Sequence, residues 1–447
     1  MSINKYIVRS TFVGALGGLL FGFDTAVISG TTAGLIHAYS LSAQQLGITV
    51  SIALWGTVVG ALVSGSLGQR YGSREMLRFT AILYVISSLG CAFAPGWSLL
   101  LFARFLGGLG IGGSSVLGPV YIAELAPARL RGRLVGTFQI NIVIGILLAY
   151  LSNYLISLLN FGATEWRWQL GVAAAPAAIF FVLLFGIPRS ARWLVTQDRL
   201  TEARQILEMM GSPNSEAELQ DIRESLHLER HEKASSLFEV RGSKFRYGKP
   251  IFLAIAIGAF NQLSGINAIL YYLNDIFTAA GFSRLSGNLQ AVAIGGMNLL
   301  ATLLGMMLID RVGRKLLLLI GALGTSGCLA TVAYIFFSHK HMAMLVWALV
   351  VYIAFFAVSQ GAVVWVYISE VFPTRVRGKG QSLGSGTHWI MNAILSGVFP
   401  VIAARSGAYP FVFFAAMMLL QFVVVLFFFP ETKQVSLENL QEKLGIL

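Results

Sequence analysis

Apolar stretches recur along the whole sequence, and short polar or charged segments separate them. A helix needs about 20 apolar residues to cross roughly 30 Å of hydrocarbon, and these stretches reach that length. The pattern therefore predicts an all-α membrane protein with twelve spans, at residues 10–32, 46–68, 76–95, 98–122, 134–157, 167–187, 250–273, 287–309, 315–337, 343–368, 380–403 and 408–429.

A charged segment divides the spans into two sets of six. Residues 188–249 mix basic and acidic side chains, and residues 201–228 show helical periodicity, as expected of a solvated and partly helical linker. The predicted parts are an N-terminal half at 1–187, the cytoplasmic linker at 188–249, a C-terminal half at 250–430 and a tail at 431–447.

Composition agrees with a membrane location. Hydrophobic residues make up 56% of the chain and charged residues 12%, whereas soluble proteins carry about 25% charged residues. The net charge of +12 would suggest nucleic acid for a soluble chain. Here most Lys and Arg fall in the termini and in alternate loops, which predicts a plasma-membrane protein with both termini in the cytoplasm and no nucleic-acid partner.

Several chemistries lack the residues that they require. Cys91 and Cys328 lie inside predicted spans, which argues against a disulfide framework. The histidines have no metal-ligand spacing, and the glycine-rich stretch of the fourth span does not follow a strand. Without a nucleophile–base pair either, the sequence predicts no enzyme, no metal and no cofactor.

An internal repeat relates the two halves. The pattern E-x-x-P-x-R-x-R-G occurs at 124–132, after the fourth span, and again at 370–378, after the tenth. A weaker pair, at 68–74 and 309–315, follows the second and the eighth spans. Two parallel repeats of six helices are the plan of major facilitator transporters, which bind substrate near the midplane.

Five further motifs carry a resemblance over essentially the whole chain. They are GGLLFGFD in the first span, RFLGGLGIG in the fourth, QLSGINAILYY in the seventh, DRVGRK after the eighth, and WVYISEVFPTRVRG in the tenth. In this order they resemble the sugar porter family of the major facilitator superfamily, which includes bacterial proton-coupled xylose and glucose symporters and human glucose facilitators. The resemblance implies an alternating-access carrier of a monosaccharide or polyol.

The resemblance also implies a set of sugar contacts. They fall on Gln139, Gln262, Asn267, Asn298, Trp365 and Trp389, with Asn261 and His388 at two positions where the family commonly has other residues. Amides suit a sugar because they both donate and accept hydrogen bonds, and indole suits the C–H face of the ring. Interhelical hydrogen bonds for the amides and ordinary packing for the tryptophans are the alternatives.

The seventh span holds most of these amides. Gln262 and Asn267 share a face only if the helix is broken between them, and Gly265 makes such a break plausible. Tyr271 and Tyr272 follow, either as an extracellular gate, which we favour, or as interfacial aromatic residues. For His388 we favour a polar lining role over a second titratable site.

Charges inside spans are costly and often mark ion pathways. Asp24 and Arg104 lie deep in the first and fourth spans. Burial favours a neutral carboxyl and a nearby Arg favours the charged form, so a changing distance between them would bind and release a proton. We expect Asp24 to be the proton site and Arg104 its modulator; a fixed ion pair is the alternative. In the family's facilitators the position of Asp24 is a neutral Asn, which favours symport here.

The repeated motifs predict a network of salt bridges at the cytoplasmic helix ends. Its expected members are Glu124, Arg129, Arg131, Asp310, Arg311, Arg314, Glu370, Arg375 and Arg377. Such bridges close the inner side and break when it opens; loops that only set topology are the alternative. Two segments depart from the family pattern: Gln69–Ser73 replaces D-R-x-G-R, and Pro188–Arg192 replaces P-E-S-P-R.

Proton-coupled sugar uptake is therefore the first hypothesis, with the proton as coupling ion. A facilitated carrier on the same fold is the second, and a sugar sensor without transport is a remote third. The expected partners are a small sugar and the lipid bilayer, and we expect the chain to function as a monomer.

Overall fold

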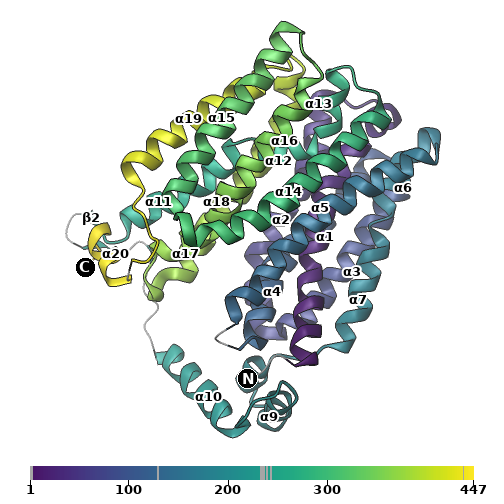
Figure 1. Cartoon of the computed structure of the whole chain (residues 1–447). Helices are drawn as coiled ribbons and strands as arrows, with labels where there is room; N and C mark the ends of the chain where they lie inside the picture. The colour runs from purple at the N-terminus through teal and green to yellow at the C-terminus, as the bar shows by residue number, and fades with distance from the viewer. Residues whose placement is uncertain are drawn as a thin grey trace. The chain divides into compact units, whose positions relative to one another are not determined.

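A computed structural model describes residues 4–127, 130–231, 237, 240–241, 244–435 and 437–446 (Figure 1). Twelve of its helical segments are long and apolar enough to cross a membrane. Each predicted span overlaps one of them, so the all-α architecture is confirmed. Single helices form nine of these segments: α1 Lys5–Tyr39, α2 Ala43–Tyr71, α3 Ser73–Ala92, α4 Trp97–Leu125, α5 Arg131–Leu158, α14 Arg284–Val312, α15 Arg314–Ser338, α18 Arg377–Ala403 and α19 Tyr409–Phe428.

The other segments include interruptions of the regular helix. The sixth, Gly162–Gly186, consists of η1 Gly162–Thr164, α6 Glu165–Gly171, α7 Ala174–Leu183 and η2 Leu184–Gly186. The seventh comprises α11 Gly248–Leu263 and α12 Ile266–Tyr271, and α13 Leu273–Ala279 continues beyond it. In the tenth, a π-helical turn, η3 Ala357–Gly361, joins α16 Met344–Phe356 to α17 Ala362–Val371. The short η4 Thr374–Val376 precedes the uninterrupted α18.

The segment between the two sets of helices is partly helical, as predicted. It contains α8 Ala191–Thr196, α9 Leu200–Met209 and α10 Ser215–His231. Buried Leu194, Leu207 and Leu219 hold these helices together through an apolar cluster. Two short strands, β1 Val240–Arg241 and β2 Lys244–Phe245, add an antiparallel pair that the sequence did not predict. The tail holds α20 Leu437–Leu444.

The chain divides into two compact units. Unit 1 is Met1–Val27, Ile52–Ser152 and Asn160–Lys233, and unit 2 is Ile28–Ser51, Asn153–Leu159 and Ala234–Leu447. The predicted extracellular ends of α1, α2 and α5 thus belong to unit 2, although the sequence repeat groups their helices with the N-terminal half.

Glycines allow the helices of unit 1 to approach closely. A Cβ on Gly22 of α1 would lie 1.8 Å from the carbonyl oxygen of Ile142 on α5, and one on Gly145 would lie 2.1 Å from that of Leu19. Small residues permit such backbone contact between membrane helices. The helix that carries Asp24 is therefore packed directly against α5.

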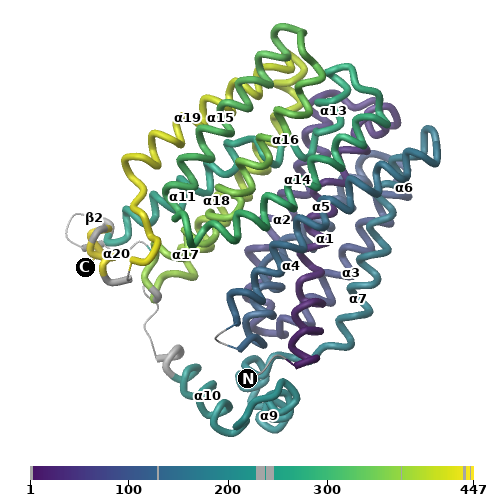
Figure 2. The backbone as a smooth tube through the Cα atoms, in the orientation of Figure 1, coloured from purple at the N-terminus to yellow at the C-terminus, as the bar shows by residue number. Residues whose placement is uncertain are grey.

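In unit 2, α19 packs beside α15, and α11 packs against α18 (Figure 2). Small residues again mark a close approach, since a Cβ on Gly47 of α2 would lie 2.0 Å from the carbonyl oxygen of Gly397 on α18. Many large apolar side chains remain exposed on the helices, including Leu300 at 64%, Trp347 at 70% and Phe427 at 73%. Such a surface suits lipid and not water.

Candidate functional site

The broken seventh segment brings three amides together in unit 2. Gly265 adopts a left-handed conformation with φ of 83°, and a Cβ there would meet Phe414 at 2.3 Å, so only glycine fits this break. Across it, Asn267 Nδ2 donates to Gln262 Oε1 at 3.1 Å, and Gln262 Nε2 donates to Asn261 Oδ1 at 3.1 Å. The predicted break is confirmed, and the amides form one hydrogen-bonded row.

Aromatic rings adjoin this row from α17 and α18. Gln262 Nε2 lies 3.1 Å from His388 Nε2, which accepts this bond only when that nitrogen carries no proton. The His388 ring lies 5.0 Å from the ring of Trp365 and 5.1 Å, edge to face, from that of Trp389. His388 and Trp389 are both buried. Neutral hydrogen-bonding groups and two indoles therefore lie side by side.

Two predicted sugar contacts lie outside this bonded row. Asn298 is on α14 of unit 2 and is buried. Gln139 is on α5 of unit 1 and is half-buried. Their roles remain predictions that rest on the family pattern.

The tyrosine pair is buried inside unit 2. Tyr272 donates its hydroxyl to the Ser396 carbonyl at 2.8 Å, and its ring stacks on Phe399 at 5.1 Å. Asn392 Nδ2 donates to the Tyr271 hydroxyl at 3.2 Å. Both tyrosines are buried and bonded to α18, and their role as an extracellular gate stays a prediction.

The two intramembrane charges of unit 1, Asp24 and Arg104, lie near each other. Arg104 on α4 is 4% exposed and lies near enough to Asp24 on α1 to act on its charge. Cys91 on α3 lies within the influence of both, and Tyr84, whose hydroxyl is 3.0 Å from Ser114 Oγ, lies within that of Asp24. Tyr84 and Ser114 were missed by sequence reasoning, although polar side chains within two apolar spans offered a signal.

At the predicted cytoplasmic end of unit 2, Arg314 is the centre of an ion network. It binds Glu370 through two bonds, of 2.8 and 3.2 Å, and lies 3.0 Å from Asp310. Thr432 Oγ1 also donates to Glu370, at 2.6 Å. Three of the predicted members are thus brought together.

The other predicted arginines of unit 2 are placed differently. Arg311 is exposed and contributes its carbonyl, which accepts from Lys433 Nζ at 2.6 Å. Neither Arg375 nor Arg377 forms an ion pair within the described residues. Their proposed part in a network therefore stays a prediction.

Glu431, which sequence reasoning missed, caps α15. Its carboxylate accepts from the backbone N–H groups of Arg314 and Lys315, each at 3.0 Å. Burial raises the pKa of Glu431, but these bonds and those from the N–H groups of Lys433 and Thr432 outweigh it and hold the pKa below its usual value. An acid directly after the last span was the available signal.

The corresponding end of unit 1 uses a different acid. Glu75 contacts Arg74, Arg78 at 2.7 Å and Arg189 at 3.1 Å. Arg189 stands where the family motif P-E-S-P-R has Glu, so the departure from that motif coincides with a different ion network.

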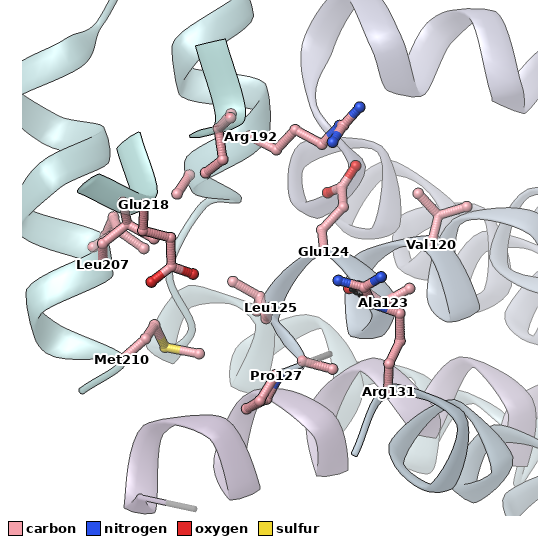
Figure 3. Close-up of a pocket in the computed structure, with 14 residues that line it drawn as sticks. Val120, Ala123, Glu124, Leu125, Pro127, Arg131, Arg192, Leu207, Met210 and Glu218 are labelled. Carbon is pink, nitrogen blue, oxygen red and sulfur yellow. Dashed lines mark hydrogen bonds between the residues drawn. The ribbon is translucent and has the colours of Figure 1, made fainter. Parts of the chain in front are cut away.

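Glu124 lies beside a pocket between α4, α5 and the linker helices. Figure 3 shows the guanidinium of Arg192 directed toward the Glu124 carboxylate. The same carboxylate accepts a hydrogen bond from Ser73 Oγ at 3.5 Å. Arg131 donates to the Ala123 carbonyl at 3.1 Å, within its own unit. Arg129 lies outside the described residues.

Comparisons with known proteins identify the family of the chain. The family model described as "Sugar (and other) transporter" matches residues 10–444. The D-xylose transporter of Levilactobacillus brevis is 37% identical, over 97% of this chain and 94% of its own length. The D-xylose-proton symporter of Escherichia coli K12 is 33% identical, over 98% and 96%.

A solved structure gives the same result for the fold. The inward open conformation of the E. coli xylose transporter XylE superposes with a TM-score of 0.85 at 33% identity, covering 98% of this chain and all of that one. This chain therefore belongs to the sugar transporter family, as a multi-pass plasma-membrane carrier of small sugars with the major facilitator fold and not as an enzyme.

Proposed function

We propose that the protein is a proton-coupled symporter of a monosaccharide or a polyol, that it works by alternating access, and that both termini lie in the cytoplasm. The names of its relatives support the substrate class, since one is called a D-xylose-proton symporter and another an arabinose-proton symporter. The distribution of Lys and Arg supports the orientation.

The neutral site in unit 2 supports sugar as the substrate. Asn261, Gln262 and Asn267 offer donors and acceptors without a net charge, and Trp365 and Trp389 offer flat apolar faces. A site built to hydrogen-bond hydroxyl groups discriminates strongly against ligands that lack them, because its own polar groups are then left unpaired. His388 fits this lining as an acceptor when the ring nitrogen that faces Gln262 carries no proton.

The half-buried carboxyl of Asp24 beside the buried Arg104 is the observation that carries the coupling proposal. A buried carboxylate is costly unless it is paired or protonated. If the cycle moves Asp24 relative to Arg104, the two conformations differ in proton affinity. A proton bound on one side of the membrane is then released on the other.

The ion networks of both units fit the same cycle. Arg314 with Glu370, and Glu75 with Arg189, lie where helices end on the predicted cytoplasmic side. Ion pairs at such ends stabilise one arrangement and must be exchanged when that side opens. The carrier needs no cofactor besides the coupling proton and functions as a monomer.

Uptake into proteoliposomes tests this proposal. A panel of pentoses, hexoses and polyols is supplied outside, with the outer solution either acidic relative to the lumen or at equal pH. A subset of the sugars should accumulate above the outer concentration only with the gradient, and a protonophore should abolish that accumulation. Liposomes without protein serve as the control.

Each failure has its own meaning. If sugar only equilibrates across the membrane, with or without the gradient, the protein is a facilitated carrier and not a symporter. If the protein binds sugar but no flux is measured, the sensor hypothesis is favoured over the carrier.

A further inference from the structure

Unit 2 contains polar contacts at the predicted extracellular ends of its helices that the proposed cycle does not use. Thr32 Oγ1, near the end of α1, donates to Asp275 Oδ1 on α13 at 2.9 Å. Arg284 Nη2, at the start of α14, donates to the Gly30 carbonyl at 3.3 Å. These bonds join segments more than 240 residues apart in the chain, and an outward opening that separates α1 from α13 must break the first of them.

Asp275 is the one carboxyl in these contacts, and its environment is unsuited to a charge. The residue is half-buried, but its Oδ2 atom is inaccessible to solvent and has no hydrogen-bond partner within the described residues. A buried carboxylate with an unpaired oxygen carries a large desolvation cost, so the neutral form is favoured there. When water reaches the carboxyl, that cost disappears.

The hydrogen bonds of Thr32 also fit a protonated Asp275. Thr32 Oγ1 has one hydrogen but two acceptors in reach, Asp275 Oδ1 at 2.9 Å and the Ser29 carbonyl at 3.3 Å. With Asp275 ionised, the two acceptors must share that hydrogen. With Oδ1 protonated, Asp275 donates to Thr32 and Thr32 donates to Ser29, and both bonds form in full.

In the described part of the chain, no cation takes the place of that proton. Among the described residues, two factors act on the ionisation of Asp275: burial, which is the larger, and the hydrogen bond from Thr32. The helices that contact α13 carry these titratable or charged groups: Lys5, Tyr6, Arg9, Asp24, His37 and Tyr39 on α1, Tyr271 on α12 with Tyr272 directly after it, and Arg284, Asp310 and Arg311 on α14. Of these, His37 is exposed, and Arg284 donates to a backbone carbonyl.

We propose that Asp275 and Thr32 form a proton-sensitive extracellular latch: protonated Asp275 holds α1 and α13 together, and ionised Asp275 lets them part. The proton enters and leaves on the side where the helices separate, so it is not carried across the membrane. Acidic external pH therefore favours the closed extracellular side, and alkaline pH favours its opening. This regulation is distinct from coupling through Asp24, although it rests on the proposed orientation.

Distances between spin labels on the two sides of the latch test the proposal. Labels at His37→Cys and Ser283→Cys, with Cys91 and Cys328 replaced by serine, report the separation of α1 and α14 in liposomes. We expect the open population to rise as pH increases from about 5 to about 8, by up to tenfold per pH unit in the open-to-closed ratio for one linked proton.

Two variants isolate the contribution of the latch to this response. Asp275→Asn mimics the neutral form and should remain closed at every pH. Thr32→Val removes the partner hydroxyl but keeps the carboxyl, so its open population should be larger than in the parent at each pH. Asp221→Asn, on the linker helix α10, is the matched control and should behave like the parent.

The background variant Asp24→Asn distinguishes this proposal from the proposed function. A pH response that persists in Asp24→Asn and disappears in Asp275→Asn supports the latch, whether or not the carrier is a symporter. A response that persists unchanged in Asp275→Asn overturns the latch. If that response disappears in Asp24→Asn, it belongs to the coupling site.

Discussion

The two units differ in the kind of polar residue that their membrane spans contain. Unit 1 holds an acid and a base within its spans, the half-buried Asp24 and the buried Arg104. The candidate sugar site of unit 2 consists of amides, a histidine and indoles. A proton site must change its charge, whereas a sugar site needs donors and acceptors that stay uncharged. The comparison suggests that one half mainly handles the proton and the other mainly binds the sugar.

The largest expected effect comes from a change in the amide row of unit 2, and it is a loss of sugar affinity. Gln262→Ala removes the bonds to Asn261, Asn267 and His388, so the amide row loses its order. Each lost bond to a substrate or neighbour costs about 1 kcal/mol, and the apparent affinity should fall by roughly 10- to 100-fold in a binding titration.

Gln421→Ala is the matched control for that change. Gln421 is equally buried in unit 2 and accepts from Gln360 Nε2 at 2.8 Å, away from the amide row. It should lower thermal stability without changing sugar affinity. Equal losses of affinity in the two variants would contradict the assignment of Gln262 to the site.

A smaller effect is expected at the predicted cytoplasmic end of unit 1. Glu75→Gln leaves Arg74, Arg78 and Arg189 without their shared carboxylate. Because these side chains are partly buried, we expect a loss of about 2 kcal/mol in the free energy of unfolding. Thermal unfolding in detergent measures it.

Glu202→Gln provides the comparison for that measurement. Its partner Arg199 and Glu202 itself are both exposed by more than a third, and such pairs contribute about 0–1 kcal/mol. If the Glu75 and Glu202 variants are equally stable, the ion pairs of Glu75 with Arg74, Arg78 and Arg189 do not stabilise the protein. Arg189 would then not compensate for the altered P-E-S-P-R motif.

The smallest effect concerns Glu431. Its pKa is lowered in the folded protein, so its contribution to stability is present above the ordinary pKa of Glu, about 4.3, and is lost as pH falls through the lowered value. Glu431→Gln should cost about 1 kcal/mol near neutral pH, as for loss of a helix cap. Thermal unfolding of the two proteins should converge at acidic pH; a constant difference would argue against the charged cap.

Hydropathy was sufficient to predict all twelve spans because each one depends on its own local composition. The break at Gly265 was also predictable, since two amides five residues apart required it to share a face. Local pattern and structure agree at both points.

Long-range partners were not predictable in the same way. The bonds from Arg189 to Glu75 and from the α15 backbone to Glu431 link positions more than 110 residues apart. Nothing in the sequence around Arg189 identifies Glu75 as its partner. The altered motif therefore indicated only that the glutamate of P-E-S-P-R is absent. Nor does the repeat predict that the ends of α1 and α5 pack with unit 2, because that depends on conformation.

Asp24→Asn tests the central claim most directly. Proteoliposomes with the wild type or the variant are given a pH gradient, and both sugar accumulation and sugar exchange at equal concentrations are measured. We expect the variant to lose accumulation yet to exchange sugar, because the proton site is lost while the amides and indoles of unit 2 remain. Full accumulation by Asp24→Asn would contradict it.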